Sequence, residues 1–254
     1  MRGIKILTIG CNFGPFNKIG KLISRLEIFL NDFVIVRDDE YKEIINNKLI
    51  SNKAVISSDF VFSKKIKKND VKNKCFLGIS AYRSLKRDEN NYCNYEALAE
   101  IADSYIEKTN FEVKIFAFDS EFENDISAAH HIYEIAKNKS KIQIIPYLGD
   151  IDNFLHEFSE CSFHICIRFH SAVLSDIYGI NFYPIAYSNK MINLIKNRYP
   201  DFDVKNIECL KKESGLKDEI LNYIFNDIEC CGQRYLPEVN SDYFDNLDKF
   251  FKNK

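Results

Sequence analysis

A chain of 254 residues spans one to two domains of about 150 residues each and is long enough to bury a substantial core. Its 35 basic and 37 acidic side chains give a formal charge of −2, which excludes a global positive field for nucleic acid or an anionic membrane. No apolar run approaches the roughly 18 residues of a membrane span, and residues 1–9 lack the apolar core of a signal peptide. We therefore expect no membrane span, no nucleic-acid partner and a cytoplasmic location.

Short β-branched runs alternate with longer helical patterns along the chain, which is typical of a parallel sheet wound with helices. The predicted strands are residues 4–9, 33–36, 53–56, 74–80, 112–118, 141–145, 163–167 and 181–185. The predicted helices are residues 16–29, 39–47, 92–109, 123–136, 151–158, 171–178 and 189–198. A short amphipathic helix at residues 243–251 needs another surface to cover its aromatic face. The pattern predicts an α/β fold.

Residues 63–74 are polar, basic and nearly free of apolar side chains. They are typical of a linker between two wound units, although a basic patch for a polyanion would use the same residues. The eight cysteines are scattered over a chain too long to need disulfides, and their spacing does not suit zinc. We expect reduced thiols and no metal site.

Two strand ends near the start of the chain carry candidate binding groups. The run Gly10-Cys11-Asn12-Phe13-Gly14 follows a strand and precedes a helix, but its spacing fits neither the dinucleotide nor the P-loop pattern. It is either a purely structural turn or a turn whose N–H groups face an anion or a sugar. Arg37 follows the buried strand 33–36, where it either binds a carboxylate or phosphate or pairs with the acids at 38–40. The sequence leaves both choices open.

The most informative run is Ile167-Arg168-Phe169-His170-Ser171. A buried strand is predicted to end at Ile167 and a helix to start at Ser171, with the Arg168 and His170 side chains pointing the same way. A permanent cation and a titratable imidazole then meet the free N–H groups of a helix start, which favours an anionic ligand such as phosphate. The other four histidines, at positions 130, 131, 156 and 164, are expected to be surface or packing residues.

These motifs, taken together, resemble those of the polysaccharide pyruvyl transferase family. The match runs over about residues 4–195 and rests on the order and spacing of several short runs. They are Ile9-Gly10-Cys11-Asn12-Phe13-Gly14-Pro15-Phe16, Val36-Arg37-Asp38-Asp39-Glu40, Ser58-Asp59-Phe60-Val61-Phe62, Gly78-Ile79-Ser80, Ile167-Arg168-Phe169-His170-Ser171, Gly179-Ile180 with Pro184, and Tyr187-Ser188-Asn189-Lys190. The resemblance implies a glycosyltransferase-B-like arrangement of two Rossmann-like units.

The resemblance also implies transfer of a pyruvyl group from phosphoenolpyruvate to a sugar of a cell-surface polysaccharide or its precursor, without a cofactor or a metal. His170 would act as general acid, with Arg168 and Arg37 gripping the phosphate and carboxylate of the donor. Further substrate-binding candidates are Ser171, Tyr187, Lys190, Asn12 and Gly14. The acceptor would be a sugar or a lipid-linked oligosaccharide, which could bring the protein to the inner face of the membrane.

The expected domains are an incomplete N-terminal unit at 1–64, a linker at 65–74, a donor-binding unit at 75–235 and a C-terminal helix at 236–254 that packs back on the fold. Members of the family usually have a much longer segment before the Gly14-Pro15 turn than this chain has. The resemblance therefore implies either a split or truncated gene, or a degenerate first unit that an oligomer or a partner chain completes. Two alternatives remain: an inactive module that keeps the donor-half fold and serves in binding or assembly, and a glycosyltransferase that uses a nucleotide sugar.

Overall fold

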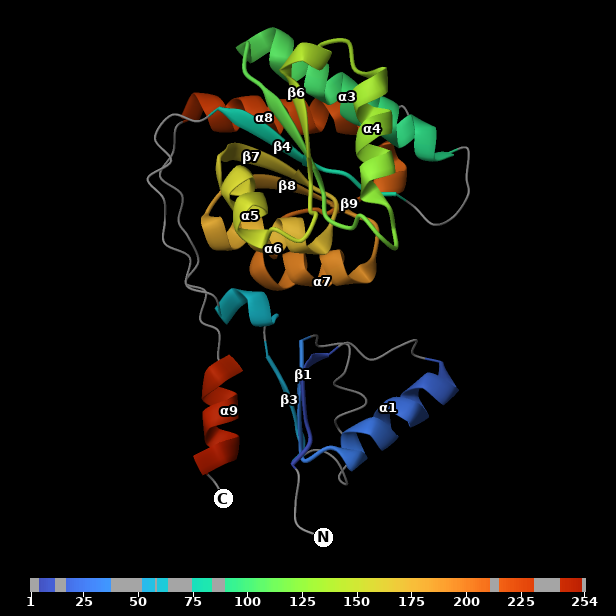
Figure 1. The fold of residues 1–254 in the computed structure, drawn as a ribbon, viewed down its shortest axis with the longest axis vertical. Helices are drawn as coiled ribbons and strands as arrows, with labels where there is room; N and C mark the ends of the chain where they lie inside the picture. Colours follow the sequence, from blue (N-terminus) through green and yellow to red (C-terminus); the bar gives the residue numbers. More distant parts are fainter. Residues whose placement is uncertain are drawn as a thin grey trace. The chain divides into compact units, whose positions relative to one another are not determined.

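The computed structural model of the chain divides into two compact units, residues 1–65 with 237–254 and residues 66–236 (Figure 1). The structure describes residues 5–11, 17–37, 52–57, 59–63, 75–83, 90–210, 215–230 and 243–252. The predicted helix at 39–47 and the predicted linker at 65–74 lie outside these residues. Each unit builds a parallel sheet of its own.

The first unit contains a three-stranded parallel sheet in the order β1-β2-β3. Its strands are β1 (Leu7–Cys11), β2 (Phe33–Val36) and β3 (Ala54–Ile56). The helix α1 (Lys18–Leu30) lies between β1 and β2 in the chain, and the short 3-10 helix η2 (Phe60–Ser63) follows β3. All four residues of β2 are buried, because β2 is the central strand.

The C-terminal helix α9 (Tyr243–Lys252) belongs to the core of this first unit. Its residues Leu247 and Phe250 pack against the cluster around Phe33 and Ile35. The rings of Phe33 and Phe250 stack with their centroids 4.8 Å apart. The helix predicted at 243–251 is thus confirmed, and the sheet of the first unit covers part of its aromatic face.

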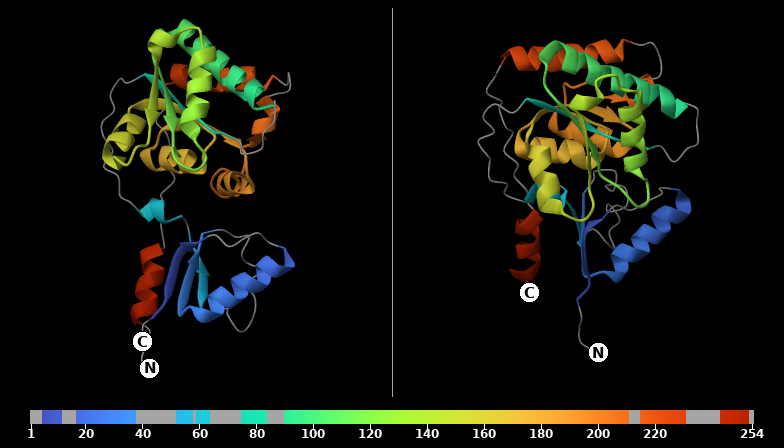
Figure 2. Two further views of the ribbon diagram at one scale, coloured as in Figure 1. Left: turned by 45° about the vertical axis from the view of Figure 1, so that its right-hand side comes forward. Right: turned by 45° about the horizontal axis from the view of Figure 1, so that its top comes forward.

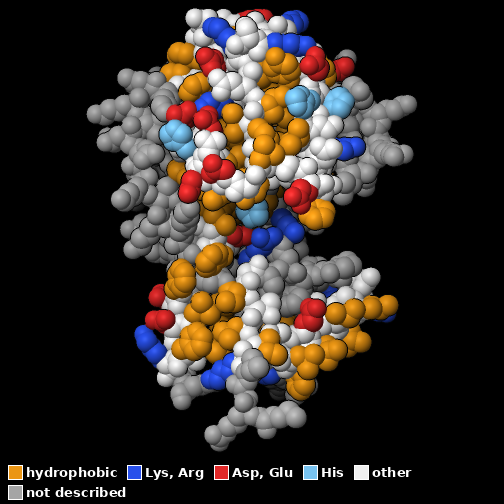
Figure 3. Space-filling model, viewed as in Figure 1, with side chains coloured by type: hydrophobic (Ala, Val, Ile, Leu, Met, Phe, Trp, Pro, Cys, Tyr) orange, Lys and Arg blue, Asp and Glu red, His pale blue; other side chains and the backbone are white. Residues whose placement is uncertain are grey.

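Helix α1 turns most of its apolar side chains away from its own sheet. Only Ser24 and Ile28 of this helix are buried. The exposed apolar residues of α1 are Ile19, Leu22, Ile23, Leu26, Phe29 and Leu30. Figure 3 shows them as a row of hydrophobic side chains along the helix. A contiguous apolar surface of this kind is more often an interaction surface than an ordinary protein exterior.

The second unit contains a six-stranded parallel sheet in the order β6-β5-β4-β7-β8-β9. Its strands are β4 (Phe76–Ser80), β5 (Val113–Ala117), β6 (Ile142–Pro146), β7 (Cys161–Cys166), β8 (Asn181–Ala186) and β9 (Lys205–Asn206). The central strands are almost fully buried, as expected for a parallel sheet covered on both faces.

Helices cover both faces of this sheet (Figure 2). The helices α3 (Asn90–Thr109), α4 (Asp125–Ile135) and α8 (Leu216–Cys230) contribute to the main core on one face. The helices α5 (Ile151–Ser159), α6 (Phe169–Tyr178) and α7 (Asn189–Arg198) pack on the other face. The remaining elements are the 3-10 helices η3 (Lys139–Lys141) and η4 (Ile207–Leu210).

The α/β fold with parallel sheets is confirmed, and each of the eight predicted strands overlaps a strand of the structure. The prediction missed α8 and the two-residue strand β9. Helix α8 had a usable signal, because Leu216, Ile220 and Ile224 recur every four residues and are all buried. Within the described residues, no helix is long and apolar enough to cross a membrane.

A buried histidine packs in the centre of the second unit, as the sequence analysis expected of His164 as a packing residue. The His164 ring is fully buried and stacks on Phe158 with ring centroids 3.8 Å apart. Its Nε2 lies 3.1 Å from the carbonyl oxygen of Phe158, so this nitrogen carries the proton and donates. Burial lowers the pKa of His164 to about 3, so the ring is neutral at physiological pH.

Candidate functional site

The turn between β7 and α6 is fixed by a hydroxyl from the neighbouring strand β4. Ser80, the last residue of β4, is fully buried, and its Oγ accepts the N–H groups of Ile167 at 2.7 Å and Arg168 at 3.0 Å. The Ser171 hydroxyl lies 3.1 Å from Ser80 Oγ and donates to the carbonyl oxygen of Arg168 at 2.5 Å. The backbone of the predicted site is therefore held from inside the protein.

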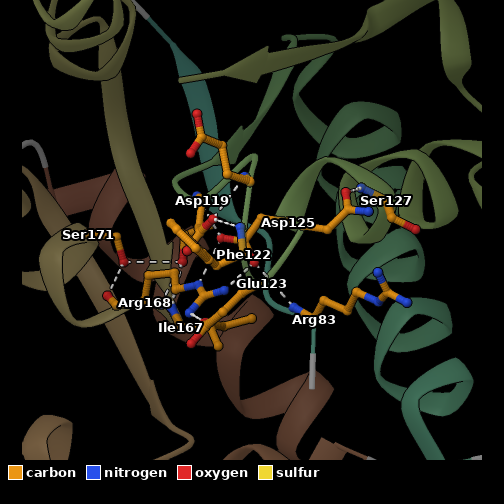
Figure 4. Close-up of polar contacts among 12 residues, drawn as sticks. Arg83, Asp119, Phe122, Glu123, Asp125, Ser127, Ile167, Arg168 and Ser171 are labelled. Carbon is orange, nitrogen blue, oxygen red and sulfur yellow. Dashed lines mark hydrogen bonds and ion pairs between the residues drawn. The ribbon is translucent and has the colours of Figure 1, made fainter. Parts of the chain in front are cut away.

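Arg168 points from the start of α6 toward two carboxylates, Glu123 in the loop before α4 and Asp125 at the first position of α4 (Figure 4). Its Nε donates to Asp125 Oδ2 at 2.8 Å, and its two terminal nitrogens pair with Asp125 Oδ1 and Glu123 Oε2. The guanidinium carbon lies 4.7 Å from the ring centroid of Tyr82 and 5.8 Å from that of Tyr187. Arg168 is only 8% exposed, and its ion pairs with Asp125 and Glu123 neutralise its charge inside the protein.

Asp125 is the centre of this carboxylate cluster. Its side chain is fully buried, and besides binding Arg168 it accepts the backbone N–H groups of Arg83 at 3.3 Å and Asp119 at 3.1 Å (Figure 4). Burial raises the pKa of the Asp125 carboxyl, whereas these donors favour its ionised form. The side chain thus joins the segments after β4, β5 and β7 at the carboxyl edge of the sheet.

Among the members of the predicted site that the structure describes, His170 and Lys190 are exposed. His170 lies in the first turn of α6, and Lys190 lies in the first turn of α7. The helices α6 and α7 follow the neighbouring strands β7 and β8, so both side chains start from the same edge of the sheet. Tyr187, from the loop after β8, is half-buried and stacks on Tyr82 with ring centroids 4.3 Å apart.

Helix α6 begins two residues earlier than predicted, at Phe169, and Arg168 becomes its N-cap residue. As a result, Arg168 is buried while His170 is exposed, so the two side chains do not share one ligand-facing side as expected. Ser171 is also fully buried and holds the turn through its hydroxyl. The substrate-binding roles of these residues stay predictions.

Arg37 belongs to the first unit, where it follows β2 as predicted. Its Nη1 pairs with Asp59 Oδ2 at 2.7 Å, which is the ion-pair alternative with a different acid from the one expected. The other candidates of this unit, Asn12 and Gly14, lie outside the residues that the structure describes.

Sequence reasoning missed Ser80, Tyr82 and Asp125 as members of this site. In the sequence Ser80 stands out only as the last residue of the Gly78-Ile79-Ser80 motif, and Asp125 lies inside the predicted helix 123–136. The only usable signal was their position, since Ser80 ends a buried strand and Asp125 lies shortly after the next one in the chain. Strand ends of a parallel sheet gather at one edge, where ligands bind in folds of this type.

Comparison with solved structures supports the fold. The UDP-GlcNAc 2-epimerase of Methanocaldococcus jannaschii matches 99% of this chain and 71% of its own length, at 9% identity and a TM-score of 0.63. Its complex with UDP-GlcNAc and UDP matches 88% of this chain and 62% of its own length, at 12% identity and a TM-score of 0.57. A glycosyltransferase from Rickettsia africae matches 97% of this chain and 70% of its own length, at 15% identity and a TM-score of 0.50.

These likenesses place the chain in the glycosyltransferase-B-like fold class, as predicted. The chain spans between 62% and 71% of the lengths of these three solved proteins. No curated protein matches the chain. The sequence model of the polysaccharide pyruvyl transferase family matches residues 1–189, and this chain therefore belongs to that family of transferases.

Proposed function

We propose that the protein transfers a pyruvyl group from phosphoenolpyruvate to two hydroxyls of a sugar in a cell-surface polysaccharide or its precursor. The observation that carries the proposal is the exposed His170 in the first turn of α6, on a turn fixed by Ser80 and Arg168, in a chain of this family. A titratable ring on a fixed backbone suits proton transfer to a bound substrate.

The proposed chemistry needs one proton donor and no redox step. Protonation of the methylene carbon of phosphoenolpyruvate creates an oxocarbenium-like centre at C2, and a sugar hydroxyl attacks that carbon. Phosphate then leaves and a second hydroxyl of the same sugar closes the ketal. Of the two hydroxyl protons released, one balances the proton gained by the methyl group and the other leaves with phosphate. His170 is proposed as the acid in this sequence.

The arginines call for a more specific assignment than a direct grip on the donor. The guanidinium of Arg168 is already paired with two carboxylates. An anionic donor that bound Arg168 directly would therefore be repelled by the negative charges of these carboxylates. We assign Arg168 a positioning role for the α6 turn, and we assign the donor contacts to Lys190 and Tyr187. A donor contact by Arg37 remains part of the proposal, and it would have to compete with Asp59.

The test compares wild-type protein with His170→Ala in an assay of phosphate release from phosphoenolpyruvate, using a panel of methyl glycosides as acceptors. We expect loss of at least about a hundredfold in rate, the usual contribution of a general acid. His130→Ala is the matched control, because His130 is an exposed histidine of α4 in the same unit. Undiminished phosphate release by His170→Ala would refute the role of this residue.

Two further outcomes would replace the proposal. Stabilisation by phosphoenolpyruvate in a thermal-shift titration, without phosphate release for any acceptor, would favour a binding or assembly module. Stabilisation by a UDP-sugar at concentrations where phosphoenolpyruvate has no effect would favour a nucleotide-sugar glycosyltransferase. A cytoplasmic location stays a prediction.

We also propose that an oligomer or a partner chain completes the first unit, and the exposed apolar side chains of α1 support this. Light scattering of the purified chain would give the mass of the complex. If the protein is a monomer at all concentrations, a second copy of this chain does not complete the first unit.

A further inference from the structure

The three most exposed large hydrophobic residues in the described part of the second unit lie at one edge of its sheet. Phe122 is 86% exposed, Leu148 is 74% exposed and Ile151 is 47% exposed. Phe122 follows β5, and the other two follow β6, the neighbouring parallel strand. All three therefore lie at the carboxyl edge, the same edge that carries Arg168 and His170.

Hydrogen bonds within the loop after β5 hold the backbone of the exposed Phe122 in place. The carboxylate of Asp119 accepts the N–H groups of Glu121 at 3.0 Å and Phe122 at 2.8 Å (Figure 4). The Ser120 hydroxyl donates to the carbonyl oxygen of Tyr147 at 3.0 Å, which ties this loop to the loop after β6. The next residue, Glu123, pairs with Arg168. An aromatic ring is thus presented to solvent directly beside the Arg168 cluster.

The charges around these three side chains narrow the class of ligand. Residues 118–135 and 146–160 contain several aspartates and glutamates but no lysine or arginine. Such a surface disfavours polyanions such as nucleic acid and anionic lipid membranes. Within the described residues, no group of three or more histidine, cysteine or acidic side chains is placed to hold a metal ion. Exposed apolar side chains beside carboxylates suit a neutral ligand that has hydroxyl donors and an apolar face.

We propose that Phe122, with Leu148 and Ile151 beside it, is the acceptor platform: a surface that stacks against the C–H face of an uncharged pyranose ring. The negative face of the aromatic ring attracts the weakly positive C–H groups of the sugar. Exposed carboxylates such as Glu121 accept hydrogen bonds from the sugar hydroxyls. The assignment rests on the proposed function for the ligand being a saccharide.

The absence of tryptophan from the sequence allows a direct binding test on the whole chain. Phe122→Trp keeps an aromatic platform and adds the only tryptophan, so its fluorescence reports stacking of a sugar. We would titrate this variant with the methyl glycosides of glucose, galactose, mannose and N-acetylglucosamine, and measure saturation transfer from the wild-type protein to the same glycosides. We expect an emission shift and saturation transfer with at least one of them.

Phe122→Ala should weaken that binding by about tenfold, the loss expected for one aromatic stacking contact. Phe111→Ala is the matched control, because Phe111 is 39% exposed and precedes β5 at the opposite end of the same strand. It should bind the glycoside like the wild type. Phe122→Ala should keep the wild-type melting temperature, since Phe122 is 86% exposed, and the melting temperature of Phe111→Ala shows that the control variant is folded.

The proposal is overturned if no glycoside of the panel binds, if Phe122→Ala binds as tightly as Phe111→Ala, or if the protein instead binds phosphatidylcholine–phosphatidylglycerol vesicles through Phe122. These readouts are independent of turnover. Glycoside binding through Phe122 without phosphate release would support the platform while the proposed reaction fails. Phosphate release that is unchanged in Phe122→Ala, together with unchanged binding, would leave the reaction standing and remove the platform.

Discussion

Gly78 is required by its neighbour across the sheet and not by its backbone conformation. It pairs directly with His164 of β7, and a Cβ at this position would lie 2.0 Å from Nδ1 and 2.2 Å from Cε1 of the imidazole. The ring cannot move away easily, because Phe158 stacks on its face. The pair of residues therefore acts as one packing unit, in which the missing side chain of one makes room for the other.

We expect Gly78→Ala to lower the free energy of unfolding by about 3 kcal/mol, the upper end of the usual cost of overpacking a core. Adding His164→Ala to the same chain should recover part of that loss, because the atoms that clash are gone. Urea unfolding of both single variants and the double variant measures the coupling. Additive losses would contradict this account of Gly78.

His164 also makes stability depend on pH. Burial lowers its pKa from 6.5 to about 3. Between pH 6.5 and pH 3, the His164 ring therefore binds a proton in the unfolded chain but not in the folded chain. The contribution is complete above pH 6.5 and is lost as the pH falls, by at most about 1.4 kcal/mol per pH unit. In urea unfolding between pH 6.5 and 4.5, His164→Gln should show a shallower loss than the wild type. Parallel profiles would mean that the ring titrates normally in the fold.

Several elements meet at the carboxyl edge of the second sheet through Asp125. It starts α4, and its side chain binds Arg168 at the start of α6 and the backbone before α3. Glu123 binds the same guanidinium but keeps 34% of its side chain exposed, whereas Asp125 has none. The two acids therefore allow a matched comparison of a buried and a partly solvated partner.

Asp125→Ala should cost about 3–5 kcal/mol of unfolding free energy, because it leaves the buried Arg168 charge without its two-point partner. Glu123→Ala should cost about 1 kcal/mol or less, as expected for a partner that water can replace. Asp125→Asn keeps the shape and removes the charge, so its effect separates packing from ion pairing. Equal losses for the two alanine variants would show that Asp125 does not hold the turn.

The sequence predicts the helices and strands well, but it predicts poorly which residues from different elements contact one another. Periodicity and capping residues are local, so the sequence predicts helix α7 with the bounds that it has. Asp150 is a local cap of this kind, since it accepts the N–H group of Asn153 at the start of α5. The partners of Arg168 lie more than 40 residues away, at Asp125 and Ser80. No local sequence pattern predicts such distant partners. The sequence alone therefore suggests that Arg168 is available to bind an anion.

On the scale of the whole molecule, the first unit is discontinuous in sequence. Its sheet comes from residues 7–56, whereas α9, which packs against Phe33, comes from residues 243–252. The second unit, residues 66–236, is inserted between these two parts and has its own core. Loss of the C-terminal segment should therefore lower the stability of the first unit, which also contains β1, β2 and β3.

We expect a chain that ends at residue 236 to lose amide-exchange protection in β1, β2 and β3, because the face around Phe33 and Ile35 is then open to water. Protection in β4, β5 and β7 should stay at the wild-type level. Phe250→Ala, which deletes one stacked ring, should lower protection in the first sheet only partly. A uniform loss over both sheets would contradict the division into two cores.

The discontinuous first unit has a consequence for the order of synthesis. The ribosome delivers β1, β2 and β3 first, but α9 emerges only after every residue of the second unit. Since domains commonly fold as they leave the ribosome, the second unit can finish folding while one face of the first sheet is still uncovered. The N-terminal unit is thus the last to be completed, and its face around Phe33 and Ile35 stays open to water until α9 has been synthesised.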